Sequence, residues 1–310
     1  MKRICAVVIS AFLAVQGLSA QLFCWNLENY FDCKGDPATA DEVFTPGGEH
    51  RWTRRKMVAK RNLIAKTIIA SASCFGGETP SLVGLCEVEN EYVLKTLTED
   101  TPLAKIGYKV LHRDSGDPRG IDVALLYDPS RIHLLSHEFI TIADFSTRDI
   151  LYAKVAMPDT LHVFVNHWPS KYSGAKASET KRLAVAAALE ATLDSLYAVD
   201  SGAKIVVMGD FNATPEEPSI KGLCERARLQ NLSAAGGGGT IRFKGKWELI
   251  DHLLASPAAA QTIGSAKVFK PAFLLEDDKT FMGKKPRRTH VGPRYNGGVS
   301  DHLPIIADIF

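Results

Sequence analysis

Short apolar runs bounded by turn residues recur along this chain and constrain its fold more than any other feature. They lie at 21–27, 81–87, 107–112, 121–127, 133–139, 150–156, 161–166, 204–209, 248–255 and 303–309. Runs of this length are typical of strands buried within a sheet. The chain therefore needs extensive β-structure with both faces of its sheets covered.

Helical patterns lie between some of these runs. The clearest cover 54–72 and 178–198, and a third covers roughly 217–228. In the second, an apolar stripe is expected from Leu183, Ala187, Leu189, Leu193 and Leu196. Strands mixed with helices predict an α/β sandwich, with sheets packed together and helices outside.

The N-terminus has the pattern of a secretory signal. Lys2 and Arg3 precede an apolar run over 4–15, and Leu18-Ser19-Ala20 offers a small-residue cleavage site. The run is short for a membrane span. We expect a signal peptide over 1–20, cleavage near Ala20, one domain over 21–310, and a secreted or periplasmic protein.

Charge and cysteine content exclude some classes of site. Loss of Lys2 and Arg3 lowers the formal charge from +2 to zero, so affinity for a polyanion must come from local patches. The strongest patch is the basic loop 276–299, a substrate contact or a solvated loop. No Cys/His spacing typical of zinc is present, and Cys24 and Cys86 are expected to be buried apolar residues.

Polar residues follow several of the apolar runs directly. The groups are Asn26 with Glu28, Glu87, His167, Asp210 with Asn212, and Asp251 followed by Asp301-His302. Residues two apart in a strand share a face, so each such pair is expected to point to one place. Phosphate-ester hydrolysis needs charge neutralisation, an activated water and stabilisation of the leaving oxygen, which these residue types supply.

In their order, these motifs resemble the endonuclease/exonuclease/phosphatase superfamily, which includes deoxyribonuclease I. The matching runs are Trp25-Asn26-Leu27-Glu28-Asn29, the Glu87 segment, Arg119 to Tyr127, Asn166-His167-Trp168, Gly209-Asp210-Phe211-Asn212, Ile250-Asp251-His252 and Ser300-Asp301-His302-Leu303-Pro304. The resemblance covers essentially the whole chain after the signal. It implies a four-layer α/β sandwich, in which two packed mixed β-sheets are flanked by helices.

The resemblance also implies roles for individual residues. Glu87 would be the main metal ligand, with Asn26, Asp301 and Glu28 as further ligands. Asp210 and Asn212 would position the attacking water and a phosphoryl oxygen, or hold a second metal. The implied cofactor is Mg²⁺ or Mn²⁺, with Ca²⁺ as an alternative.

The implied roles extend to the two histidines and to an arginine. His302 would be either the base-side or the phosphate-contacting imidazole, oriented by Asp251. His167 would lie on the leaving-group side, oriented by Asp114. Arg148 would bind substrate phosphate; the alternative is an ion pair with Asp149.

We therefore expect a secreted metal-dependent phosphodiesterase, a nuclease acting on DNA or RNA, monomeric and without stable membrane insertion. One alternative is a sphingomyelinase-like phospholipid esterase or an inositol or polyphosphate phosphatase of the same fold. A membrane-acting enzyme would present an exposed apolar hairpin, for which residues 269–275 are the nearest candidate. Another alternative is a catalytically inactive secreted binding protein.

Overall fold

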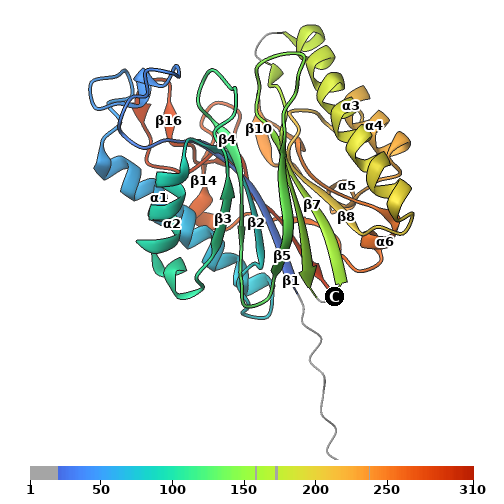
Figure 1. Cartoon of the computed structure of the whole chain (residues 1–310). Helices are drawn as coiled ribbons and strands as arrows, with labels where there is room; N and C mark the ends of the chain where they lie inside the picture. Colours follow the sequence, from blue (N-terminus) through green and yellow to red (C-terminus); the bar gives the residue numbers. More distant parts are fainter. Residues whose placement is uncertain (1–19, 158, 172–173, 237) are drawn as a thin grey trace, which may run out of the picture.

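Two six-stranded sheets pack against each other, and helices cover the outer face of each (Figure 1). The computed structural model describes residues 20–157, 159–171, 174–236 and 238–310. Apart from Ala20, the predicted signal peptide lies outside the described residues. The predicted four-layer α/β sandwich of two mixed sheets is confirmed.

The first sheet has the strand order β13-β18-β1-β2-β4-β3. Because β1 runs parallel to β2 and antiparallel to β18, this sheet is mixed. Two helices cover its outer face (Figure 1). The elements are β1 (Ala20–Tyr30), β2 (Leu82–Val88), β3 (Lys109–His112), β4 (Asp122–Tyr127), β13 (Lys267–Val268), β18 (Ile305–Ile309), α1 (Arg54–Ser71) and α2 (Glu91–Glu99).

The second sheet has the order β5-β6-β7-β8-β12-β9. Here β7 and β8 are parallel, and β12 returns antiparallel to β8. The elements are β5 (His133–Ile140), β6 (Ile150–Met157), β7 (Asp159–His167), β8 (Ile205–Asp210), β9 (Gln230–Asn231), β12 (Asp251–Ala255), α3 (Ala175–Val199) and α4 (Pro218–Arg226). The helices α3 and α4 lie on its outer face (Figure 1).

Side-chain alternation along β1 explains how one strand serves two apolar layers. Leu22 and Cys24 face the second sheet, whereas Phe23, Trp25 and Leu27 face α1 and α2. All five are buried. A strand buried on both faces reads as a continuous apolar run, which is the pattern seen in the sequence.

Smaller elements extend the sandwich at one end. The described residues form three two-stranded ribbons: β10 (Ile241–Phe243) with β11 (Lys246–Glu248), β14 (Leu275–Asp277) with β15 (Lys284–Pro286), and β16 (His290–Val291) with β17 (Arg294–Tyr295). Short helices are α5 (Leu232–Ala235) and α6 (Pro257–Ala260). The predicted strand 248–255 is thus divided, because β11 ends at Glu248 before β12 begins.

Two further predictions are settled by burial. Cys24 and Cys86 are buried free thiols, as expected. Residues 269–275, the nearest candidate for an exposed apolar hairpin, do not form one, because Phe269 and Leu274 are buried in the core beneath α1 and α2. None of the helices in the described ranges combines the length and hydropathy of a membrane span.

Candidate active site

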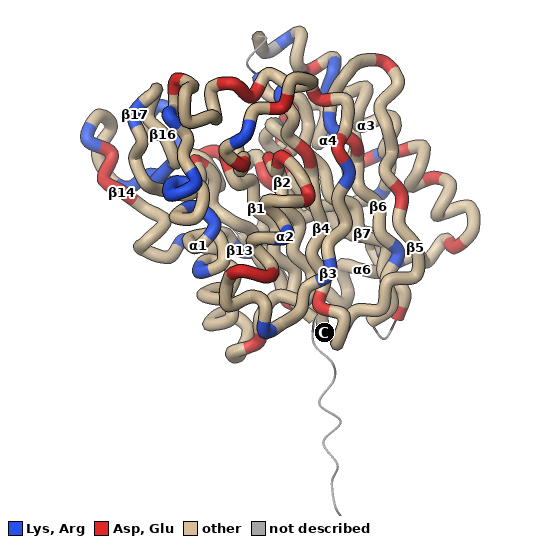
Figure 2. The backbone as a smooth tube through the Cα atoms, turned by 60° about the vertical axis from the view of Figure 1, so that its left-hand side comes forward, with Lys and Arg blue, Asp and Glu red and all other residues tan. Residues whose placement is uncertain are grey.

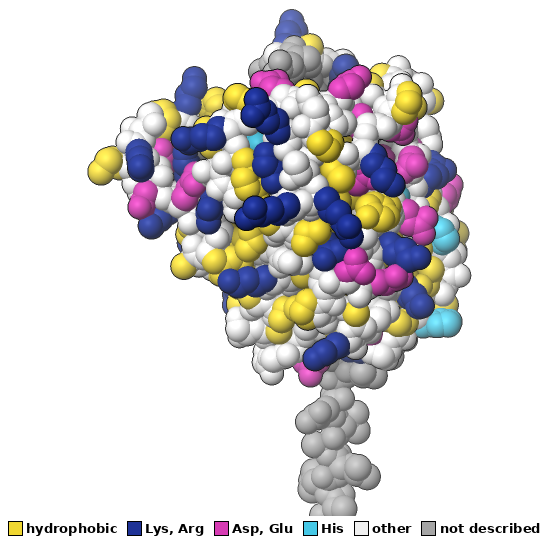
Figure 3. Space-filling view, turned by 90° about the vertical axis from the view of Figure 1, so that its left-hand side faces the viewer, with side chains coloured by type: hydrophobic (Ala, Val, Ile, Leu, Met, Phe, Trp, Pro, Cys, Tyr) yellow, Lys and Arg dark blue, Asp and Glu magenta, His cyan; other side chains and the backbone are white. Residues whose placement is uncertain are grey.

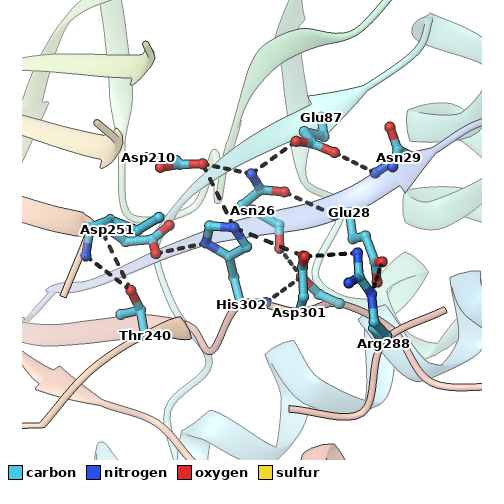
Figure 4. A network of polar contacts seen from close by, with 12 residues as sticks. Asn26, Glu28, Asn29, Glu87, Asp210, Thr240, Asp251, Arg288, Asp301 and His302 are labelled. Atoms are coloured by element: carbon cyan, nitrogen blue, oxygen red, sulfur yellow. Dashed lines mark hydrogen bonds and ion pairs between the residues drawn. The ribbon is translucent and has the colours of Figure 1, made fainter. Parts of the chain in front are cut away.

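The strand ends that carry the predicted polar residues meet at one end of the sandwich. In the second sheet, the registers pair His167 with Asp210 and Asp210 with Asp251. In the first, Asn26 pairs with Cys86, one residue before Glu87. The two sheets pack face to face, so these groups converge in space (Figure 4).

Asn26 links the two sheets at the centre of the cluster. Its side-chain amide donates to Asp210 Oδ2 at 2.8 Å and to Glu87 Oε1 at 3.3 Å. Asn26 and Asp210 are almost completely buried. A single amide therefore holds a carboxylate from each sheet in a fixed relative position (Figure 4).

Irregular backbone at the ends of β1 and β2 orients the carboxylates. Glu28, Asn29 and Glu87 have φ of 49°, 59° and 61°, and the β1–β2 register shifts beyond Asn26. Bulges of this kind redirect a side chain. Here the bulge allows the backbone N–H of Asn29 to donate to Glu87 Oε2 at 2.7 Å.

Gly209 permits the close approach of β7 and β8 just before Asp210. A Cβ at this position would lie 1.9 Å from the carbonyl oxygen of Asn166, and its φ is 145°. No other residue type fits such an approach. The glycine of the Gly-Asp-Phe-Asn motif therefore sets where Asp210 lies relative to His167.

His302 is held by a carboxylate. Its Nδ1 lies 2.8 Å from Asp251 Oδ2, and its Nε2 lies 3.8 Å from Asp210 Oδ2. Burial lowers the pKa of the imidazole, but the Asp251 and Asp210 carboxylates outweigh burial and raise the pKa well above its ordinary value. His302 is therefore a cation at neutral pH, with Nε2 directed at the cluster.

His167 has the opposite electrostatic character. Its Nε2 lies 3.6 Å from Asp210 Oδ2 and 3.8 Å from Glu87 Oε1. Burial, together with the charges of Arg148 and Arg119, lowers the pKa well below its ordinary value. The two imidazoles therefore flank Asp210 in different protonation states.

Asp210 lies between these histidines and is itself perturbed. Burial raises its pKa to about 7, against the opposing charge of His302. The backbone N–H of Asn212 donates to Asp210 Oδ1 at 2.9 Å, and the Asn212 side chain donates to Trp168 O at 3.0 Å. A carboxyl group that titrates near neutrality can exchange a proton with water there.

The donor set fits a divalent cation. Asp210 and Asp251 offer carboxylate oxygens within 4.8 Å of each other and of His302, whose protonated ring is not itself a ligand. Within the described ranges, Glu87 and Asp210 have only histidines as ion-pair partners, and Asp251 Oδ1 is buried without a hydrogen-bond partner. Acidic residues gather beside the ends of β1 and β2 (Figure 2). Carboxylate oxygens of this kind are ligands for Mg²⁺ and Ca²⁺.

Glu28 does not join this set, which corrects its prediction as a metal ligand. The bulge turns its side chain away, and its two oxygens accept from Arg288 Nε and the Thr289 N–H, both at 2.8 Å. Arg288 also lies 3.0 Å from Asp301 Oδ2. Asp301 keeps its other oxygen 3.9 Å from His302 Nε2 and remains at the edge of the cluster (Figure 4).

Arg148 is a buried structural residue rather than a phosphate ligand. Its guanidinium lies 2.8 Å from Asp117 Oδ2 and donates to the carbonyls of His167 and Trp168. The alternative prediction, an ion pair between Arg148 and Asp149, is also wrong, because Asp149 pairs with Arg113 at 2.5 Å. Arg148 therefore supports the backbone that follows β7.

Asp114 does not orient His167. Its carboxylate is exposed and lies 3.8 Å from His112 Nδ1. In the described part of the chain, His167 Nδ1 has no hydrogen-bond partner at all. The loop before Arg119 directs Asp114 outward, which sequence order could not reveal.

A family model described as the Endonuclease/Exonuclease/phosphatase family matches residues 21–309. The chain belongs to this family. Membership supports a hydrolase of phosphate esters and accounts for the ordered motifs at the strand ends. No curated protein sequence matches the chain.

Solved structures of low sequence identity share the fold. A mannosyl-6-phosphatase from Bacteroides thetaiotaomicron has 15% identity and a TM-score of 0.59, covering 94% of this chain and 100% of the other. The human nocturnin catalytic domain has 16% sequence identity and a TM-score of 0.56, with 94% of each chain covered. Truncated TDP2 from Caenorhabditis elegans has 15% sequence identity and a TM-score of 0.57, covering 95% of this chain and 98% of the other.

Several residues that build the site were missed from the sequence. Lys60 is buried on α1 and donates to Glu28 O at 2.6 Å and Val299 O at 2.8 Å. Ser300 Oγ donates to Asn26 O at 2.6 Å, which ties the Ser-Asp-His segment to β1. Ser300 could have been found, because it lies in the Ser-Asp-His motif. Lys60 could not, because a lysine in a helix is ordinarily exposed.

Proposed function

We propose that this chain is a secreted, divalent-metal-dependent phosphodiesterase that hydrolyses DNA or RNA. The observation that carries the proposal is the convergence of carboxylates around Asp210 whose ion-pair partners, among the described residues, are only one cationic and one neutral imidazole. A bound cation and a phosphate diester together supply the charges that this arrangement lacks.

Glu87, with Asn26 and Asp301 nearby, would hold the cation. When bound, Mg²⁺ or Mn²⁺ would neutralise phosphoryl oxygens and the developing charge on the leaving oxygen. The described residues fix the donors beforehand, because Asn26 and the Asn29 N–H already hold Glu87 in place.

The remaining steps belong to side chains. His302, kept protonated by Asp251, donates Nε2–H to a phosphoryl oxygen and stabilises the charge that develops during attack. Asp210, with a pKa of about 7, accepts the proton of the attacking water. Asn212 positions that water, and neutral His167, 3.6 Å from Asp210 Oδ2, faces the leaving group.

Nucleic acid is the proposed substrate because cationic side chains continue from the cluster. Arg288, Lys285 and Lys244 line a pocket that also contains His302 and Asn212. Lysine and arginine contacts to backbone phosphates supply most of the sequence-independent affinity for nucleic acid.

A substrate panel tests this assignment. Purified protein is incubated in Mg²⁺ with supercoiled DNA, RNA, sphingomyelin vesicles, inositol polyphosphate, mannose 6-phosphate and bis-p-nitrophenyl phosphate. We expect cleavage of nucleic acid and of the aryl diester, and no cleavage by a His302→Ala variant purified in parallel. Turnover of lipid or phosphomonoester with intact nucleic acid would reject the nuclease, and turnover of none would favour a binding protein.

A further inference from the structure

A pocket of about 390 Å³ opens directly beside the catalytic cluster. Asn212, Asp301 and His302 form one side of it. The opposite side is formed by the ribbons β10–β11 and β14–β15, including the turn between β14 and β15. The volume is within the range of roughly 300–1,000 Å³ that is typical of small-molecule sites.

The two ribbons form one wall, which is fixed to the catalytic segment. Ile241 of β10 makes an antiparallel bridge with His302. Arg242 donates to Lys284 O and Met282 O, each at 2.5 Å, and lies 3.8 Å from Asp278. The wall therefore has a defined position relative to His302.

Two aromatic rings of this wall are exposed and line the pocket. Phe243 is 56% exposed and Phe281 is 50% exposed. They come from different ribbons, and Gly245 lets Phe281 lie close to the β10–β11 turn, since a Cβ there would lie 2.7 Å from Phe281 Cβ. Two exposed phenylalanine rings in one pocket offer π faces on which a planar group can stack.

Cationic side chains accompany these rings. Lys244 Nζ lies 5.2 Å from the centre of the Phe243 ring, and Lys285 and Arg288 line the same pocket. The face of the molecule that includes α1 and the C-terminal ribbons shows lysine and arginine side chains interspersed with apolar ones (Figure 3). Aromatic rings with basic residues along a groove are the features that bind single-stranded nucleic acid.

We propose that this pocket receives an unpaired base next to the scissile phosphate, so that the enzyme acts on single-stranded nucleic acid. Phe243 and Phe281 stack with the base, and Lys244 and Lys285 contact flanking phosphates. The inference rests on the proposed function. In a duplex the bases are stacked on each other, so their faces do not reach the rings.

The exposed rings and basic side chains of this wall suit a single nucleic-acid strand better than a lipid surface. A membrane-binding hairpin presents apolar residues at its tip. Here the turn of β10–β11 contains Lys244 and Gly245, and the rings of Phe243 and Phe281 border the pocket that ends at His302. The rings therefore face the space that a substrate would occupy.

Hydrolysis rates on a single-stranded oligonucleotide and on its duplex test the inference. We expect the wild-type protein to cleave the single strand at least about tenfold faster. Phe243→Ala and Phe281→Ala should each lose about tenfold on the single strand, since one stacked base contributes that much. Their loss on bis-p-nitrophenyl phosphate, which has no base, should be much smaller.

Two further variants keep the result interpretable. Phe243→Leu retains an apolar side chain and fold but lacks the ring, so it should lose activity on the single strand as well. Trp247→Ala removes an exposed aromatic residue of the same hairpin that does not line the pocket, and it should behave as wild type.

The outcomes separate the two proposals. Equal rates on single strand and duplex, unchanged by Phe243→Ala, would overturn the inference while diester hydrolysis still supports the proposed function. Loss of sedimentation with sphingomyelin vesicles in Phe243→Ala, with unchanged oligonucleotide cleavage, would overturn it in favour of a membrane surface. Absence of hydrolysis of any diester would overturn the proposed function itself.

Discussion

Asp210 shows how one residue combines catalytic value with a cost in stability. It is buried among Asn26, His167 and His302, and its folded-state pKa is about 7. Its ordinary value is about 3.9. The folded protein therefore binds this proton more tightly than the unfolded chain, and ionisation of Asp210 destabilises the fold as pH rises toward 7.

Asp210→Asn should therefore stabilise the protein in the absence of metal. At pH 8 in EDTA, we expect a gain on the order of 1 kcal/mol in the free energy of unfolding. The gain should shrink as pH falls from 7 toward 4, where wild-type Asp210 is protonated. Urea denaturation at several pH values measures this, and a less stable variant at pH 8 would show that the buried charge is already compensated.

The effect of Asp251 on the protonation of His302 can be tested directly. Asp251→Asn removes the carboxylate that contributes most to raising the pKa of His302, so that pKa should fall. The imidazole pKa can be followed by NMR titration of the variant against wild type. Diester hydrolysis at pH 8 should fall by at least about a hundredfold as the cationic form is lost. An unchanged pKa would remove Asp251 from its orienting role.

The motif residues could be predicted, whereas their neighbours could not. Asp210 ends the apolar strand β8 and Ser300 to His302 precede the apolar strand β18, and strand pairing places such ends side by side. Glu28 shares the motif with Asn26, but a positive φ turns it toward Arg288. Arg148 likewise has a partner, Asp117, that sequence proximity to Asp149 concealed.

At the scale of elements, strands were more predictable than helix faces. The helix α2 was missed although Asn90 caps it by accepting from the Val93 N–H and Glu91 lies in its first turn. On α3, Leu183 and Ala187 of the expected stripe are exposed, and Val185 and Ala186 are buried instead. Buried Arg182, which pairs with Glu179, shifts the buried face of this helix.

Lys60 connects α1 to the site and gives an element-scale prediction. It is fully buried, and burial lowers its pKa to about 8. Lys60→Met should lower the free energy of unfolding by about 3 kcal/mol, because Glu28 O and Val299 O lose their donor. Lys66→Met, on the exposed face of α1, should cost less than about 1 kcal/mol in the same urea titration. Equal losses of unfolding free energy in the two variants would show that the Lys60 hydrogen bonds do not stabilise the fold.

At the scale of the whole molecule, the pattern of apolar and polar residues was sufficient to predict the four layers of the fold. Continuous apolar runs predicted sheets buried on both faces, and the four layers follow from that requirement. The ribbons beside the site could not be predicted, because β10, β11 and β14 to β17 are each two or three residues long. Their position depends on contacts such as Arg242 with Met282 that no local pattern encodes.

Export is a prediction for the whole chain. Expression of the full-length gene product in a bacterium should yield an extracytoplasmic protein whose first residue is Gln21, since Leu18-Ser19-Ala20 is a signal-type cleavage site. Cell fractionation and N-terminal sequencing test this. An intact Met1 in the cytoplasmic fraction would contradict secretion.

The central claim is that Glu87 and its neighbours hold a divalent cation that the hydrolysis of phosphodiesters requires. The most direct measurement is the rate of bis-p-nitrophenyl phosphate hydrolysis against Mg²⁺ concentration for wild type, Glu87→Gln and Glu89→Gln. Glu89 is the matched control, because it follows the same strand and accepts from Asp32 rather than from the cluster. We predict loss of the wild-type rate in EDTA, recovery with Mg²⁺, a loss of at least about a hundredfold in Glu87→Gln, and a nearly normal rate in Glu89→Gln. A full rate in EDTA, or a Glu87→Gln variant as active as wild type, would contradict the account.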